Sequence, residues 1–270
     1  MRYHFSFLIF LFIATLLQAQ PVCDPAYRPV IFVHGFLASG DTWAKFSQAF
    51  RAAGYCPDRL VAYDWNTLGQ QTNQAAALDA VIDAVRARTG AKQVDIIGHS
   101  AGGGVGYAYL SDSIRAAKVN NYVHIGSMNQ KRPAGPKGSV PTLNLWSDGD
   151  RVMAGKDIPG ASNTMLPGLD HYQIATSAAS FEAVFQFLNH SPQKVIAPAA
   201  NERVRIGGRA LFLGENNPAT GAAVEVYSLD PHTGKRSGAP IAMLTTDAQG
   251  YWSVQDMPSN VPIELVLRTS

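Results

Sequence analysis

The pentapeptide Gly98-His99-Ser100-Ala101-Gly102 is the stretch whose residue types and spacing point most directly to chemistry. It has the form G-x-S-x-G, in which a strand turns sharply into a helix and presents a serine at the turn. The two glycines make the turn feasible, because a Cβ at either position would collide with the neighbouring strand or helix. A β-type apolar run precedes the motif and a helix-compatible run follows it. This context favours a nucleophilic serine over a glycine-rich turn with an inert one.

A serine hydroxyl is a poor nucleophile unless a base takes its proton and a third group orients the base. In folds with this turn, the partners follow the serine in the order acid, then histidine. His171 is the predicted base, because it lies on a loop after a short strand and before a helix, from where it can reach back to Ser100. His124 lies within a predicted strand and is interpreted as buried structure. His190 sits beside a linker and His232 belongs to a β-rich segment, which disfavours both.

Two aspartates compete for the role of the acid. Asp148 and Asp150 both follow a predicted strand over residues 142–146. We favour Asp150, because Arg151 and Val152 come directly after it and it lies further toward the site. Asp148 is interpreted as closing the turn through its own backbone.

A second motif, Val33-His34-Gly35-Phe36-Leu37, ends the first predicted strand. Its glycine lets the backbone turn so that the Phe36 amide points into a site. An oxyanion hole in enzymes with this turn takes one amide from such a loop and one from the residue after the nucleophile. We therefore expect Phe36 and Ala101 to supply it.

The surrounding sequence alternates between predicted strands and predicted helices, which is typical of an α/β domain. The clearest helix covers residues 73–89, where apolar residues recur at helical spacing and Gly90 follows. The other predicted elements are strands at 29–33, 59–63, 94–97, 122–126, 142–146 and 163–166, and helices at 41–53, 101–110 and 174–188.

The two ends of the chain differ from its middle. Residues 1–20 have the layout of a secretory signal peptide, although an uncleaved membrane anchor is the alternative. A catalytic domain over 21–190 and a Pro/Ala-rich linker over 191–203 are expected next. Residues 204–270 contain short β-rich runs separated by turn signals and predict a small β-sandwich-like domain. Its last strand ends almost at the C-terminus, which leaves open that this domain is truncated.

Export changes the interpretation of the only two cysteines. Cys23 and Cys56 each lie just before an apolar run, so neighbouring parallel strands would bring them to the same edge of the sheet. In an oxidising compartment a disulfide is the expected outcome. Two unpaired buried thiols are the alternative.

Composition sets outer bounds on function. With 46% hydrophobic and 16% charged residues, the chain is typical of a globular protein. A net charge of +2 gives no reason to expect a nucleic-acid partner.

At four places the chain resembles the α/β-hydrolase superfamily, specifically small secreted lipases and esterases of the lipase class 2 type. These are Val33-His34-Gly35-Phe36, Gly98-His99-Ser100-Ala101-Gly102, the segment 147–152, and Leu169-Asp170-His171. They span about 27–190. The resemblance implies a mostly parallel sheet with helices on both faces. It also implies ester hydrolysis through an acyl-enzyme, with no metal and no cofactor. The tail more weakly resembles a carboxypeptidase regulatory-like or transthyretin-like sandwich.

These observations predict an exported, secreted or periplasmic serine hydrolase that cleaves lipophilic carboxylic esters. The segments that would surround its site contribute apolar side chains as candidate substrate contacts, namely Leu37, Met128, Met153 and Leu169. One rival is a polyester depolymerase or amidase with the same triad, in which the C-terminal domain adsorbs to a surface or lipid. The other is a non-catalytic binding protein with the same fold. Every predicted catalytic residue precedes residue 192, so we expect the site to be complete without the C-terminal domain.

Overall fold

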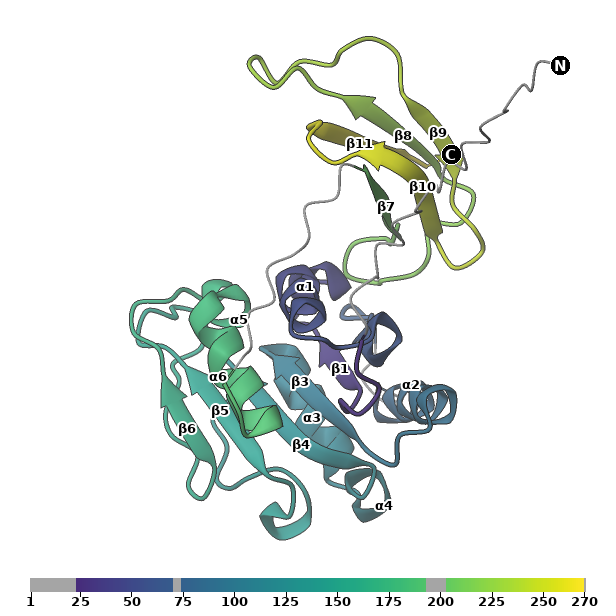
Figure 1. The fold of residues 1–270 in the computed structure, drawn as a ribbon. Helices are drawn as coiled ribbons and strands as arrows, with labels where there is room; N and C mark the ends of the chain where they lie inside the picture. The colour runs from purple at the N-terminus through teal and green to yellow at the C-terminus, as the bar shows by residue number, and fades with distance from the viewer. Residues whose placement is uncertain (1–22, 70–73, 193–202, 270) are drawn as a thin grey trace, which may run out of the picture.

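The computed structural model describes residues 23–69, 74–192 and 203–269 (Figure 1). The predicted signal peptide over 1–20 lies outside the described residues, as does most of the predicted linker over 191–203. In the part of the chain that is described, no helix is both long and apolar enough to cross a membrane.

A six-stranded parallel sheet forms the centre of the first two-thirds of the chain. Its strands stand in the order β2-β1-β3-β4-β5-β6, and every neighbouring pair is parallel. The predicted α/β class is confirmed. The strands are β1 (Val30–Val33), β2 (Leu60–Tyr63), β3 (Val94–His99), β4 (Val119–Ile125), β5 (Thr142–Trp146) and β6 (Ser162–Met165).

Helices cover both faces of this sheet, which is why every residue of β1 and β3 is buried. Alternate residues of a strand point to opposite faces. In β1, Val30 and Phe32 join one core cluster, while Ile31 and Val33 join the other. The first cluster is completed by side chains of α1 (Ala44–Ala52) and α6 (Ala178–Asn189), and the second by α2 (Gln74–Thr89) and α3 (Ala101–Leu110).

Two predicted helices are divided in the structure. The helix expected over 41–53 begins as the 3-10 turn η1 (Gly40–Trp43) before α1. The helix expected over 174–188 is α5 (Gln173–Thr176) followed by α6, with Ser177 extended between them at ψ 156°. The Ser177 side chain accepts a hydrogen bond from the Ser180 amide and so caps the second helix. The remaining short elements are η2 (Pro57–Arg59), α4 (Ser113–Ala116) and η4 (Pro136–Gly138).

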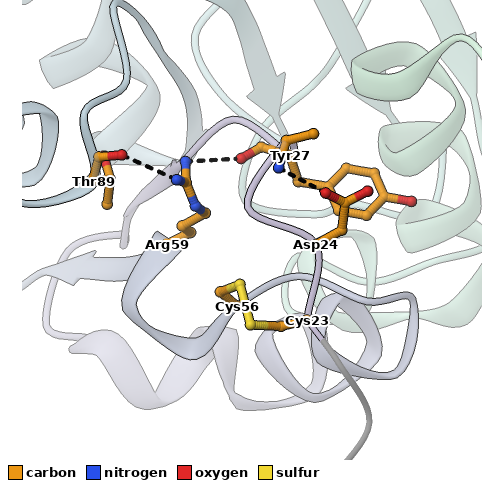
Figure 2. The surroundings of a disulfide bond; sticks show 7 residues. Cys23, Asp24, Tyr27, Cys56, Arg59 and Thr89 are labelled. Atoms are coloured by element: carbon orange, nitrogen blue, oxygen red, sulfur yellow. Dashed lines mark hydrogen bonds between the residues drawn. A yellow bond between two sulfur atoms is a disulfide. The ribbon is translucent and has the colours of Figure 1, made fainter.

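Cys23 and Cys56 form a disulfide beside the start of β1 and β2 (Figure 2). The side chain of Arg59 reinforces this corner, since its guanidinium donates to the carbonyl oxygens of Tyr27 and Thr89, each at 3.1 Å. The segment before β1 is thereby tied to both β2 and the end of α2.

Residues 203–268 form two small antiparallel sheets, which lie together apart from the parallel sheet (Figure 1). One pairs β7 (Arg203–Arg209) with β10 (Tyr251–Pro258). The other has the order β11-β8-β9, from β11 (Ile263–Arg268), β8 (Ala223–Ser228) and β9 (Ala242–Thr245). The predicted all-β character of this region is confirmed.

Candidate active site

Ser100 stands at the turn between β3 and α3 with an unusual backbone, φ 53° and ψ −125°. The surrounding glycines are required by packing. A Cβ at Gly98 would lie 2.7 Å from the Gly102 carbonyl oxygen, and one at Gly102 would overlap the carbonyl oxygens of Val33 and His34. The turn therefore presses against the end of β1, and no side chain fits between them.

His171 and Asp150 meet Ser100 in a continuous hydrogen-bonded chain. Asp150 Oδ2 lies 2.7 Å from His171 Nδ1, and His171 Nε2 lies 2.9 Å from Ser100 Oγ. Asp150 follows β5 and His171 lies between β6 and α5, so the carboxyl ends of three parallel strands supply the three groups. A carboxylate facing Nδ1 holds the proton on that nitrogen, which leaves Nε2 free to accept the serine proton.

Asp150 is held in place from two sides. Its side chain is 1% exposed, and its Oδ1 accepts hydrogen bonds from the amides of Val152 and Met153 at 2.8 and 2.9 Å. Burial by itself would raise the pKa of this carboxyl, but the hydrogen bonds from His171 and the two amides outweigh it and lower the pKa. The group is thus a fixed, ionised acceptor.

Asp148 has a different environment. It is exposed, and its Oδ1 accepts from the Gly168 amide at 2.8 Å, on the loop that carries His171. The expectation that Asp148 closes its own turn is therefore wrong, because its partner lies 20 residues away.

The loop after β1 lies against the serine. A Cβ on Gly35 would be 3.1 Å from the Ser100 Cβ. Among the described residues, the Phe36 amide has no hydrogen-bond acceptor. Ala101 is the first residue of α3, so its amide has no partner within the helix.

His34 fixes the direction of this loop. It is fully buried, and its Nδ1 lies 2.9 Å from the Gly35 carbonyl oxygen. A carbonyl only accepts, so Nδ1 carries the proton and Nε2 accepts, which it does from the Trp65 amide at 3.2 Å. Burial lowers the pKa of His34 and favours this neutral form.

The four candidate substrate contacts differ in exposure. Leu37 and Met128 are exposed at 45% and 63%, whereas Met153 and Leu169 are only partly exposed. Leu169 packs against the core cluster that contains Phe32, which gives it a structural task beside the site. Within the described residues, no three His, Cys, Asp or Glu side chains are arranged to hold a metal ion.

Two residues beside Ser100 and His171 carry no signal in the sequence for their contacts there. His99 Nε2 donates to the His171 carbonyl at 2.8 Å, and burial lowers the pKa of His99 to about 4. Ser127 Oγ donates to the Ser100 carbonyl at 2.6 Å. Both follow predicted strands, but only the fold shows that they face the turn. His124 is buried, as expected, and its Nε2 donates to the Met128 carbonyl at 2.9 Å.

Two family models match this chain. One, described as the alpha/beta hydrolase fold, matches residues 28–134, and one described as the lipase C-terminal domain matches residues 202–270. Residues 28–134 are thus similar to α/β-hydrolases, and residues 202–270 to the C-terminal domain of lipases.

Solved structures agree at the level of the fold. The mature form of the lipase BlEst2 of Bacillus licheniformis is similar with a TM-score of 0.51 and 16% identity over 62% of this chain and 94% of that chain. Its propeptide form gives a TM-score of 0.50 and 14% identity over 93% of this chain and 74% of that chain. The carboxylesterase CesB of Bacillus subtilis gives a TM-score of 0.49 and 13% identity over 63% of this chain and 86% of that chain. In this chain, the carboxyl ends of the parallel strands carry the candidate site, as is usual for open α/β sheets.

Proposed function

We propose that this chain is an exported carboxylic ester hydrolase that works through an acyl-enzyme, with Ser100, His171 and Asp150 as its catalytic triad. The observation that carries this proposal is the hydrogen-bonded chain from carboxylate to imidazole to hydroxyl, at 2.7 and 2.9 Å. The match of residues 202–270 to a lipase C-terminal domain supports a lipase or esterase over other hydrolases of this fold.

In the acylation step, Ser100 Oγ attacks the ester carbonyl carbon and its proton passes to His171 Nε2. The carbonyl electron pair moves onto the oxygen, where the amides of Phe36 and Ala101 donate to it. Asp150 keeps its charge and stabilises the imidazolium that forms. When the tetrahedral intermediate collapses, the C–O bond to the alcohol breaks and the alcohol leaves with the proton from Nε2.

Deacylation repeats the same steps with water. His171 Nε2 takes a proton from water as the hydroxide oxygen bonds to the acyl carbon. Collapse then breaks the bond to Ser100 Oγ, which recovers its proton from the imidazolium, and the carboxylic acid departs.

A lipophilic substrate is supported by the side chains next to the site. Phe36, Met128, Val152 and Tyr172 are neighbours in sequence of residues that contact the triad or belong to it, and between 57% and 65% of each is exposed. Apolar side chains gathered at a polar site are typical of a binding surface for an apolar ligand.

Export is supported by two independent features. Residues 1–20 have the layout of a signal peptide. The Cys23–Cys56 disulfide suits an oxidising compartment.

The proposed reaction is tested with p-nitrophenyl esters from acetate to palmitate, using the wild-type chain and Ser100→Ala. We expect turnover by the wild type only, with equal thermal unfolding of both proteins. A fluorophosphonate should add one label per wild-type chain and none to the variant. Turnover by Ser100→Ala above about a tenth of the wild-type rate would reject the nucleophile, since its loss typically costs many orders of magnitude. A wild-type chain that neither turns over nor labels would be a non-catalytic binder. Turnover of p-nitroanilides in preference to esters would favour the amidase.

A further inference from the structure

A tight turn of the C-terminal region, residues 212–217, lies against the loop that follows β1. Its own backbone closes it, through hydrogen bonds from the Asn216 amide to the Phe212 carbonyl at 2.8 Å and from the Phe212 amide to the Asn217 carbonyl at 3.0 Å. Asn216 has a left-handed backbone with φ 57° and is 6% exposed. Asparagine tolerates this backbone better than most residues, so the turn buries its side chain without a large conformational cost.

Among the described residues, the buried Asn216 amide group hydrogen-bonds only to the α/β region. Its Nδ2 lies 2.9 Å from the Ala38 carbonyl, 2.8 Å from the Trp65 carbonyl and 3.3 Å from His34 Nε2. The side chain thus joins the loop after β1 to the segment after β2.

A second contact from the same turn reaches Leu37, the neighbour of Ala38 on the loop after β1, through Thr67. The Gly214 carbonyl accepts from both the amide and the hydroxyl of Thr67, at 2.7 and 2.8 Å. The Thr67 hydroxyl oxygen in turn accepts from the Leu37 amide at 3.2 Å. Gly214 fits closely, because a Cβ there would lie 2.9 Å from side-chain atoms of Leu37 and Leu68.

These contacts bear on the direction of one peptide group. The Gly35 carbonyl points at His34 Nδ1, and in a trans peptide the next N–H points the opposite way. Holding the Gly35 carbonyl on His34 therefore fixes the direction of the Phe36 N–H, the amide that we propose donates to the oxyanion. With the proton on Nδ1, His34 Nε2 is an acceptor, and it faces the Trp65 amide at 3.2 Å and the Asn216 amide group at 3.3 Å, so both favour this tautomer.

The loop has a reason to need this support. Leu37 has φ 53°, a left-handed backbone that is strained for a bulky residue. A loop under such strain relaxes when its restraints are removed. The peptide group between Gly35 and Phe36 precedes Leu37 by one residue, so its rotation is a direct route to relieve the strain.

We propose that Asn216 is a positioning residue for the oxyanion hole: with Gly214 it clamps residues 34–38 from the C-terminal region and holds the Phe36 amide in its donating direction. This inference rests on the proposed ester hydrolysis. It also assigns the C-terminal region a part in the chemical step, in addition to any part in adsorption.

The test uses the full chain with two substitutions of Asn216. Asn216→Gly removes the side chain while suiting the left-handed backbone. Asn216→Asp keeps the shape but turns the donor into an acceptor that faces two carbonyls. The matched controls are Asn217→Gly and Asn217→Asp, because Asn217 is exposed and, among the described residues, its side chain hydrogen-bonds only to Glu215, at 3.3 Å.

The measurements are kcat and KM with p-nitrophenyl butyrate, counted per active site by fluorophosphonate titration, and the inhibition constant of a trifluoromethyl ketone. Loss of a whole oxyanion donor costs about 10²–10³ in kcat. Because the Trp65 amide still donates to His34, we expect a fall of about 10- to 100-fold in kcat with both Asn216 variants, and KM within about threefold. The ketone should weaken by the same factor as kcat/KM, since it mimics the tetrahedral state. The Asn217 controls should stay within about twofold of the wild type.

Titration per active site keeps partial unfolding from imitating this result. If the Asn216 variants melt at a lower temperature but retain kcat and ketone affinity within about twofold, Asn216 only joins the two regions and the proposal is overturned. An equal loss of kcat in the Asn217 controls would also overturn it. If Asn216→Gly does not fold, Asn216→Asp decides by the same criteria. A wild-type chain without turnover or label would instead reject the ester hydrolase, and this proposal with it.

Discussion

Replacing Asp150 with asparagine separates its orienting role from its structural role. The asparagine Oδ1 can still accept from the amides of Val152 and Met153, which donate to Asp150 Oδ1 at 2.8 and 2.9 Å in the native chain. The local turn is therefore preserved. Opposite His171 Nδ1, however, an amide NH₂ replaces the carboxylate oxygen that lies 2.7 Å away. Two N–H groups repel each other, so the imidazole moves its proton to Nε2. There it faces the Ser100 hydroxyl and cannot act as a base.

The magnitude follows from this tautomer change. A triad with the wrong tautomer loses about 10⁴ in kcat, equivalent to roughly 5 kcal/mol in the barrier. The free energy of unfolding should fall by only about 1 kcal/mol, because a neutral hydrogen bond replaces a charge-assisted one.

The assay is steady-state hydrolysis of p-nitrophenyl butyrate alongside thermal unfolding, with Asp148→Ala as the control. Asp148 is exposed and its side chain bonds only to the Gly168 amide among the described residues. We expect its removal to cost about 1 kcal/mol of stability and to leave kcat within a few-fold. A fall in kcat of less than about tenfold in Asp150→Asn, or a larger loss in Asp148→Ala, would refute the assignment of the acid.

Three further outcomes are expected from the structure. Cys23→Ser/Cys56→Ser opens a loop with a sequence separation of 33 residues, so urea unfolding should show a loss of about 4 kcal/mol; an unchanged midpoint would contradict this. Burial lowers the pKa of His124 to about 4, whereas an unfolded histidine has a pKa of about 6.5. As the pH falls through that window, the unfolded state takes up a proton that the native state does not, so the free energy of unfolding should fall by about 1.4 kcal/mol per pH unit from this residue. Urea unfolding of His124→Gln should show a slope reduced by about that amount, and equal slopes would be inconsistent with a neutral buried imidazole. Gly102→Ala places a Cβ on backbone carbonyls at the end of β1 and should lower the free energy of unfolding by about 3 kcal/mol. A Cβ on Gly104 meets nothing within 4 Å, so Gly104→Ala should raise Tm. Similar Tm values for the two variants would show that the turn is not packed as described.

The elements of the parallel sheet were predictable because their signals are local. Each buried strand is a short apolar run, and the strand at 142–146 has the predicted bounds. The predicted helix at 174–188 conceals a break, because α5 and α6 pack on the same core cluster and the apolar spacing continues through Ser177. Periodicity reports the buried face of a helix and is insensitive to one extended residue within it.

The members of the candidate triad could be named from their order and from the elements around them, and the structure brings Ser100, His171 and Asp150 within hydrogen-bond distance. The residues that support the site could not. The Gly168 partner of Asp148 and the His171 partner of His99 are contacts between side chains and distant backbone, and no local pattern encodes them. For the same reason, no local pattern encodes the hydrogen bonds that join Gly214 and Asn216 to the segments after β1 and β2. Beyond the clamp, Arg209 pairs at 2.9 Å with Asp64, whose other oxygen accepts from the Gly40 amide.

The bonds from Asn216 to His34 and Ala38 join positions 182 and 178 residues apart. During synthesis the N-terminal part of a chain emerges first and can begin to fold while the rest is still being added. The parallel sheet and its serine turn can therefore assemble well before Asn216 exists. The loop after β1 receives the hydrogen bonds of Asn216 only after residue 216 has been added, so a polypeptide released before that point would contain Ser100, Asp150 and His171 while this loop still lacked those bonds.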